Sequence, residues 1–208
     1  MYFEADMPLT LEVAAKPPLF YRTIHALATA SLRFLRGIEA SGLENVPPSG
    51  RVIVACNHVS VVDPPFAGVA LGQARYARFL AKEELFRIPL LGAFFRGCGA
   101  IPLCRGRGDV GAIREALAVL ENDGCLVLFP EGTRARHGKP LRPKAGVGLL
   151  ARETGAPVVP ARVRDTEGLF RRGPLKIRFG TPLHFAGGEG RQDCQAFAEK
   201  VMEAVWQL

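Results

Sequence analysis

Short apolar runs alternate with helix-like segments along most of the chain beyond residue 50. Apolar runs bounded by turn residues predict buried strands, whereas apolar residues recurring every three to four positions predict helices. The predicted strands are Arg51–Cys56, Tyr76–Ala81, Gly99–Cys104, Cys125–Phe129, Pro157–Val163 and Leu175–Phe179. The predicted helices are Pro64–Leu71, Pro89–Phe95, Val110–Asn122, Ala145–Thr154 and Cys194–Gln207, with Asp109 and Asp193 as N-caps of the third and last. This alternation predicts an α/β fold, a mixed sheet flanked by helices.

The segment before this alternation has the pattern of an amphipathic helix. Pro17 and Pro18 open it, and it continues to about Arg36 before Gly37 and Gly42. One predicted face is apolar, formed by Phe20, Ile24, Leu27, Phe34 and Leu35, and the opposite face holds Arg22, His25, Arg33 and Arg36. The apolar face either packs on the core or lies in a membrane interface. We therefore divide the chain into a helical, potentially membrane-facing segment (residues 1–42) and a main domain (residues 43–208).

A second apolar stretch runs from Leu85 to Leu103 and is interrupted by Arg87 and Arg96. Two interpretations of this stretch stay open. It belongs to the core, or it forms a groove for a long acyl chain.

Positive charge is concentrated in one quarter of the chain. The 27 Lys and Arg outnumber the 20 Asp and Glu, giving a net charge of +7. Between Arg134 and Arg178 there are twelve Lys or Arg against three acids. Such a region predicts an anionic partner: a phosphorylated small molecule, an acidic protein, an anionic lipid or a nucleic acid. Nucleic acid is the weakest of these because the region lacks interleaved aromatic residues, and we expect none.

The cysteines and the N-terminus indicate the compartment. Five cysteines without CxxC or zinc-type spacing predict reduced, structural thiols, which favours the cytosol. Acidic residues interrupt the N-terminus, so we expect no signal peptide. No apolar run reaches the ~18 residues of a membrane span. The four histidines are scattered, and we predict no metal site.

A histidine and an aspartate lie five positions apart directly after the first predicted strand. The residues are Asn57-His58-Val59-Ser60-Val61-Val62-Asp63, followed by Pro64. Asp63 precedes a proline and is therefore expected to be extended. A turn between the two could bring the carboxylate to the imidazole, which fixes the tautomer and leaves the other ring nitrogen free to accept a proton. This predicts a general base; the alternative is an ordinary structural hydrogen bond.

A polar turn follows the strand at 125–129. Glu131, Gly132, Thr133 and Arg134 place a carboxylate, a hydroxyl, main-chain N–H groups and a cation at a strand end. Thr133 and Arg134 suit a phosphate, and Glu131 could bind a substrate hydroxyl or hold an arginine. Arg105 follows another strand, and Lys144 precedes a helix whose N-terminus favours an anion. The alternative is a turn of solvated charges.

The segment Gly106–Gly111 fits GxGxxG and would suit a dinucleotide site. Asp109 stands where the pyrophosphate would approach, and Arg107 occupies the tight turn. A nucleotide-binding enzyme is therefore a minor alternative.

These motifs together resemble the glycerol-phosphate acyltransferases typified by the PlsC-type 1-acylglycerol-3-phosphate acyltransferases. Residues 57–63 match the NHxSxxD motif, and residues 129–136 match FPEGTRSR with Ala135 in place of serine. Residues 99–105 and 158–161 resemble the second and fourth motifs, although Pro102 and Cys104 depart from the usual second motif. The resemblance covers roughly residues 50–182.

The resemblance implies transfer of a fatty acyl group from acyl-CoA or acyl-carrier protein to the hydroxyl of a lysophospholipid, without a cofactor. His58 would take the hydroxyl proton and Asp63 would orient it. The matching positions that imply substrate binding are Asn57, Ser60, Arg105, Glu131, Gly132, Thr133 and Arg134, with Pro160 on the acyl-donor side. Lys144, which lies in none of the motifs, is added as a substrate-binding residue because its charge precedes a helix N-terminus.

We expect a peripheral enzyme on the cytoplasmic face of an anionic membrane, with 1-acylglycerol-3-phosphate as acceptor and phosphatidic acid as product. Two alternatives stay open. One is the same chemistry on another lysolipid or an amino-acid lipid. The other is an anionic-lipid-binding module without catalytic activity.

Overall fold

The computed structural model describes residues 17–72, 75–104, 110–135, 140–167 and 173–208. Its helices are α1 (Leu19–Leu35), α2 (Asp63–Leu71), α3 (Pro89–Gly97), α4 (Val110–Glu121), α5 (Gly146–Thr154) and α6 (Arg191–Gln207), with short 3-10 helices at Leu43–Asn45 and Glu83–Phe86. Its strands are β1 (Ile38–Ser41), β2 (Val52–Cys56), β3 (Ala77–Lys82), β4 (Ala100–Leu103), β5 (Cys125–Leu128), β6 (Val158–Arg164) and β7 (Leu175–Phe179). The predicted α/β fold is confirmed.

The strands form a single mixed sheet in the order β1-β7-β6-β2-β5-β3-β4. Every pair is parallel except β6 and β7, which are antiparallel. All five residues of β2 are buried, as expected for a central strand covered on both faces. The edge strand β1 was not predicted, and its residues had been assigned to the N-terminal segment. Four half-exposed residues give too short a pattern to indicate a strand.

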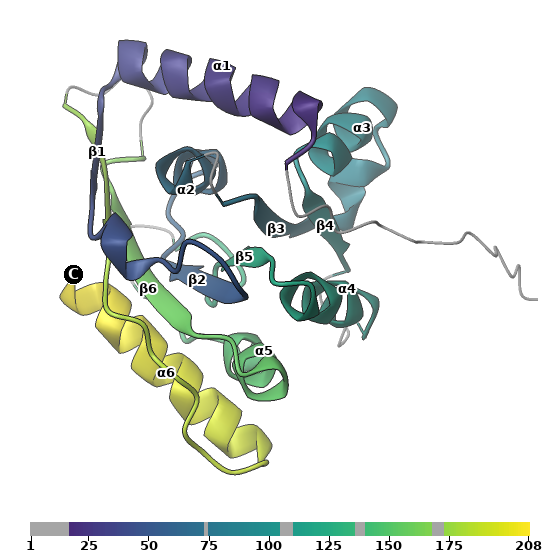
Figure 1. Ribbon diagram of the computed structural model, residues 1–208, viewed down its shortest axis with the longest axis vertical. Coiled ribbons are helices and arrows are strands. Elements are labelled where there is room, and N and C mark those ends of the chain that lie inside the picture. The colour runs from purple at the N-terminus through teal and green to yellow at the C-terminus, as the bar shows by residue number, and fades with distance from the viewer. Residues whose placement is uncertain (1–16, 73–74, 105–109, 136–139, 168–172) are drawn as a thin grey trace, which may run out of the picture.

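Helices cover both faces of the sheet (Figure 1). Residues of α1 and α2 pack with Val54, Cys56 and Val159 on one face. Residues of α4, α5 and α6 pack with Ile53, Ala55 and Val158 on the other. Since neighbouring positions of a strand point to opposite faces, β2 contributes alternate residues to the two cores.

Helix α1 packs mainly through residues outside its apolar stripe, so packing of that stripe on the core, one of the two open interpretations, is wrong. Tyr21 and Leu32 are buried, His25 Nε2 lies 3.2 Å from the carbonyl oxygen of Gly68 in α2, and buried Arg36 donates to main-chain carbonyls. His25 and Arg36 therefore lie on the packed side and not on a solvated basic face, which corrects the prediction. The predicted apolar stripe is largely outside: Phe34 is 90% exposed and Leu27 60%.

Two local predictions were also wrong. Helix α2 begins at Asp63, which is helical rather than extended, because its carboxylate holds the turn before it and the prolines occupy the first helical positions. Helix α6 begins at Arg191, so Asp193 is its third residue and not the N-cap, although its carboxylate accepts the N–H of Gly190 at 3.1 Å. Asp109 lies outside the described residues.

Cys56, Cys125 and Cys194 are buried in the core. None of the helices that the structure describes is both long and apolar enough to span a bilayer.

Candidate active site

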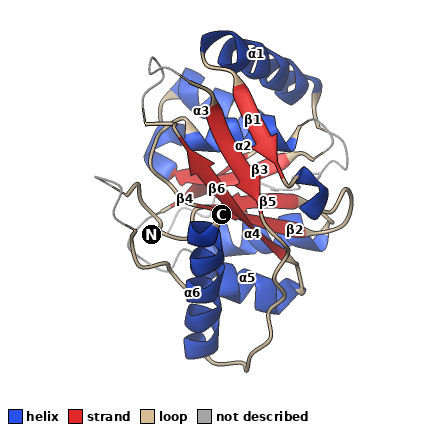
Figure 2. Cartoon of the chain, turned by 90° about the vertical axis from the view of Figure 1, so that its left-hand side faces the viewer, coloured by secondary structure: helices blue, strands red, loops and turns tan. Residues whose placement is uncertain are grey.

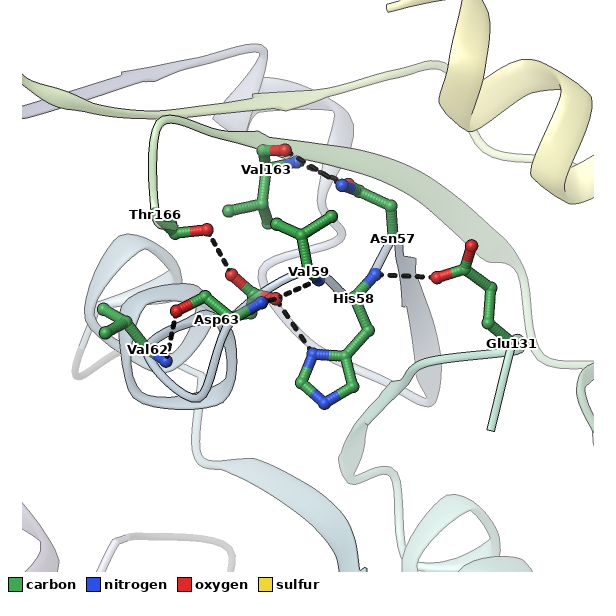
Figure 3. Close-up of polar contacts among 9 residues, drawn as sticks. Asn57, His58, Val59, Val62, Asp63, Glu131, Val163 and Thr166 are labelled. Atoms are coloured by element: carbon green, nitrogen blue, oxygen red, sulfur yellow. Dashed lines mark hydrogen bonds and ion pairs between the residues drawn. The ribbon is translucent and has the colours of Figure 1, made fainter. Parts of the chain in front are cut away.

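His58 and Asp63 meet at the carboxyl end of β2. His58 Nδ1 lies 2.9 Å from Asp63 Oδ2, as Figure 3 shows. The carboxylate accepts hydrogen bonds, so Nδ1 carries the proton and Nε2 presents a lone pair. The Asp63 side chain is fully buried, whereas 14% of the His58 side chain is exposed. The imidazole is therefore oriented from within the protein and open to a reactant on its other edge.

Four donors surround the Asp63 carboxylate. Oδ2 accepts the N–H groups of Val59 and Ser60, each at 2.7 Å, in addition to the His58 ring. Oδ1 accepts the hydroxyl of Thr166 at 2.5 Å. A buried charge needs such partners to remain stable. The turn of residues 59–62 is therefore folded around the carboxylate, and the predicted general-base geometry is present.

Thr166 is a positioning residue that the sequence analysis missed. It is 1% exposed and lies two residues beyond β6, 103 positions from Asp63. No local pattern connects the two residues. The one signal near it is Asp165, whose φ of 62° is unusual for a residue other than glycine.

Glu131 connects the polar turn after β5 to the loop that carries His58. Its Oε2 accepts the main-chain N–H of His58 at 2.9 Å, and its Oε1 accepts that of Leu141 at 3.1 Å. The N–H of Ala135 donates to the carbonyl of His58 at 2.7 Å. The contacts of Glu131 thus differ from both proposed tasks, a substrate hydroxyl or an arginine. The buried carboxylate fixes the main chain on which the imidazole stands.

Asn57 extends the sheet through its side chain. Its Nδ2 donates to the carbonyl of Val163 at 3.0 Å, and its Oδ1 accepts the N–H of Val163 at 2.7 Å. The amide is 2% exposed and both of its hydrogen-bonding ends contact main chain. Asn57 therefore attaches the start of the His58 loop to β6 and positions the dyad.

The other motif residues form two groups. Ser60 is buried, with 9% of its surface exposed, and its hydroxyl accepts the N–H of Val62 at 3.2 Å. Thr133 and Arg134, in the turn next to His58, and Lys144, which precedes α5, have exposed side chains. Those three can reach a ligand in solution, whereas Ser60 supports the turn.

Gly132 and Lys144 are in close contact. Gly132 has φ +70°, and a Cβ built there would lie 2.9 Å from Lys144 Cε. The Lys144 N–H also donates to the carbonyl of Pro130 at 2.8 Å. The absent side chain thus leaves room for the lysine to cross the turn.

Two predicted residues lie apart from this group or outside the structure. Pro160 is buried within β6, paired in register with Ala55 of β2. Arg105 and most of the Gly106–Gly111 motif lie outside the described residues. The described part of the chain contains no group of three or more His, Cys, Asp or Glu side chains suited to a metal ion.

An aromatic ring completes the surroundings of the imidazole. The ring centroids of Phe129 and His58 are 4.4 Å apart, with the planes tilted by 33°. Phe129 directly follows β5 and precedes the polar turn. A histidine held by a buried carboxylate, packed on an aromatic ring and adjacent to exposed cations, has the geometry that general-base chemistry requires.

Known proteins are similar to this chain in sequence and in fold. A family model described as "Acyltransferase" matches residues 37–164. A 1-acyl-sn-glycerol-3-phosphate acyltransferase of Bacillus subtilis (strain 168) is 29% identical over 178 residues, covering 83% of this chain and 88% of that protein. A chloroplastic enzyme of the same name from Brassica napus is 29% identical over 178 residues, covering 80% of this chain but 50% of that protein. The chain thus spans half the length of the plant relative.

A solved structure has the same architecture. The crystal structure of PlsC from Thermotoga maritima, entitled a 1-acyl-sn-glycerophosphate (LPA) acyltransferase, aligns with a TM-score of 0.72 at 28% identity. The alignment covers 90% of this chain and 78% of that one. The chain therefore belongs to the acyltransferase family, as an O-acyltransferase similar to PlsC.

Proposed function

We propose that this protein transfers a fatty acyl group from the thioester of acyl-CoA or acyl-carrier protein to the free hydroxyl of 1-acylglycerol-3-phosphate, giving phosphatidic acid. The observation that supports this most is the 2.9 Å contact between His58 Nδ1 and the buried carboxylate of Asp63. The names of the relatives from Bacillus subtilis and Brassica napus support the choice of acceptor.

The reaction needs one proton carrier. His58 Nε2 takes the proton of the acceptor hydroxyl as its oxygen attacks the thioester carbonyl carbon. The carbon–sulfur bond then breaks, and the imidazolium returns the proton to the departing thiolate, so that an ester and a thiol are formed. Asp63 holds the ring and balances its transient charge, with Thr166 and the N–H groups of residues 59 and 60 keeping the carboxylate in place.

The acceptor's phosphate requires cations next to the imidazole. We assign this role to Thr133 and Arg134, which are exposed in the turn that follows Phe129, and to the exposed Lys144 before α5. Arg105 is also assigned to phosphate binding, because of its position in the second motif. Glu131, Gly132, Asn57 and Ser60 support this site through the main chain. Pro160, which is buried within β6, supports the acyl-donor side of the site by shaping that strand.

The exposed apolar face of α1 supports peripheral attachment to a membrane. Leu19, Phe20, Leu27, Phe34 and Leu35 are between 47% and 90% exposed. Ile88 and Leu90, at the start of the neighbouring helix α3, are 54% and 88% exposed, and Phe94 packs edge-on against Phe20. These residues form an apolar surface next to Arg22 and Arg33, typical of an interfacial helix on anionic lipid. The lysophospholipid would then reach the site from the membrane.

A transfer assay with a panel of lysolipid acceptors, read by mass spectrometry, tests the proposal. His58→Ala should lower transfer about 10²–10⁴-fold, whereas His184→Ala, at an exposed histidine, should not. Vesicle binding should survive both changes. Transfer that persists in the His58 variant would exclude this mechanism. An acceptor other than 1-acylglycerol-3-phosphate with the highest rate would assign the same chemistry to that lipid, and vesicle binding without any transfer would indicate a lipid-binding module.

A further inference from the structure

A groove lies at the edge of the sheet far from α3, on the face that α6 only partly covers. It has a volume of about 420 Å³ and is lined by β1, β7, β6 and the end of α6. Its polar lining is Glu39, Ser41, Arg162, Arg164, Lys176 and Arg178. Figure 2 shows α6 ending against these strands, with part of β1 and β6 left without a helix in front of them.

Like charges face one another across this groove. In the antiparallel register, Arg162 is opposite Arg178 and Arg164 is opposite Lys176. Directly opposed like charges destabilise a sheet. Two neighbouring pairs of opposed residues therefore hold four cations. Their mutual repulsion lowers the stability of the sheet, and nothing in the fold requires cations at these positions.

The protein's own acids balance this charge only in part. Lys176 Nζ lies 3.8 Å from Glu39 Oε2, at an exposed and therefore weak ion pair. Arg162 donates to the carbonyl of Trp206 and lies over its ring, and burial followed by the charge of Arg164 lowers its pKa. Within the described residues, Arg164 and Arg178 have no ion pair or side-chain hydrogen bond. The groove therefore retains unbalanced positive charge.

The form of the groove favours a small, multiply phosphorylated ligand. Its volume falls within the ~300–1,000 Å³ of small-molecule sites, and Arg supplies three of its four cations, whose forked donors suit phosphate. Leu208, the residue after α6, adds apolar lining. A bilayer fits less well, because the exposed face of α1 belongs to the helical layer on the other side of the sheet.

The groove also adjoins the dyad along the chain. Arg164 ends β6, one residue after Val163, which holds Asn57, and two before Thr166, which holds Asp63. A ligand anchored at Arg164 would therefore lie at the carboxyl edge of the sheet where the imidazole stands. The flexible pantetheine arm of an acyl-CoA joins its phosphates to its thioester, and could pass over this edge.

We infer that the groove of β1, β7 and β6 binds the phosphates of acyl-CoA, with Arg164, Arg178, Arg162 and Lys176 as the anion-binding residues. The inference rests on the proposed function, which it extends from the acceptor to the donor. Since the anchor lies apart from His58, donor binding and proton transfer should be separable by mutation.

Calorimetric titration of the full chain with free CoA tests the inference. The Arg164→Gln/Arg178→Gln variant should bind CoA about tenfold more weakly or worse, since two charge-assisted contacts are lost. The matched control Arg114→Gln/Arg191→Gln removes the same charge from exposed sites elsewhere and should bind as the wild type does. His58→Ala should also bind CoA normally. Because like charges are removed, the groove variant should be at least as stable to heat as the wild type.

A second measurement uses the donors themselves. The groove variant should show a raised KM with acyl-CoA but unchanged transfer from acyl-pantetheine, which lacks the nucleotide. Unchanged CoA binding, or equal weakening in the control, would overturn the inference. Weakened use of acyl-carrier protein with normal CoA binding would assign the groove to an acidic protein instead. Absence of transfer from every donor would contradict the proposed function. The CoA titration would still test the groove, because it measures binding and not transfer.

Discussion

The hydroxyl of Thr166 lies 2.5 Å from Asp63 Oδ1, joining the end of β6 to the start of α2 behind the His58 imidazole. Both side chains are almost completely buried. The bond engages the carboxylate oxygen that His58 does not contact, so the carboxylate is held from both sides and cannot rotate away from the ring.

We predict that Thr166→Val lowers kcat about tenfold with little change in KM. A hydrogen bond to a charged group contributes about 1.5–3 kcal/mol, part of which is lost as stability. Thr166→Ser, which keeps the hydroxyl, should restore kcat. A purely structural role would lower stability and leave kcat of the folded protein unchanged.

Glu131→Gln should impair folding and catalysis together. Both oxygens of Glu131 accept main-chain N–H groups, and a glutamine supplies only one acceptor. The unmatched amide should cost about 1–3 kcal/mol, measured by urea unfolding, and kcat should fall because the His58 main chain shifts. If stability is unchanged and only the KM for the acceptor rises, Glu131 binds the substrate hydroxyl, as the sequence analysis suggested.

The exposed stripe of α1 should control membrane attachment. Leu27→Glu/Phe34→Glu should reduce sedimentation with anionic vesicles about tenfold or more, since each buried side chain of this kind contributes about 1.5–3 kcal/mol. Val110→Glu, at an apolar residue that is 69% exposed on α4, is the control and should bind normally. Charge reversal of Arg22 and Arg33 should weaken binding further at low salt. Arg36 is unsuitable because it holds main-chain carbonyls.

Gly148 is required where α5 crosses α6. A Cβ at this position would lie 2.2 Å from the carbonyl oxygen of Cys194 and 2.7 Å from its Cα. Gly148→Ala should therefore destabilise the fold by about 1–3 kcal/mol, or about 2–4 °C of melting temperature per kcal/mol. Gly146→Ala, two residues earlier with no atom within 4 Å, should be neutral or stabilising. Equal melting temperatures for the two variants would contradict this packing.

Stability should fall in alkaline solution. Burial raises the pKa of the Cys125 thiol from 9.0 to about 11, and it raises that of Cys56 as well. Between pH 9 and 11 the native protein therefore keeps protons that the unfolded chain has released, so the free energy of unfolding is complete below pH 9 and declines as the pH rises toward 11. Urea unfolding across this range should show a smaller slope in Cys56→Ala/Cys125→Ala. An unchanged slope would assign the decline to other groups.

Much of the fold and the centre of the site followed from local pattern. Apolar runs identified six of the strands because a buried strand must be apolar whatever lies beside it. The contact of His58 with Asp63 spans five residues and needs only a turn, so the sequence predicts it. The sequence also located the polar turn from Glu131 to Arg134 at a strand end, and the structure brings it beside this pair because β2 and β5 are parallel neighbours.

Contacts between distant segments were decided by the tertiary structure alone. The bond from Thr166 to Asp63 and the opposed cations of β6 and β7 depend on register, which no local pattern encodes. The sequence left open which face of α1 is buried, for the same reason. Tyr21 and Leu32 fit against α2, while the more apolar stripe with Phe34 stays outside. A residue's hydrophobicity determines how strongly it avoids water, but the shape of its neighbours determines which residues the core can accept.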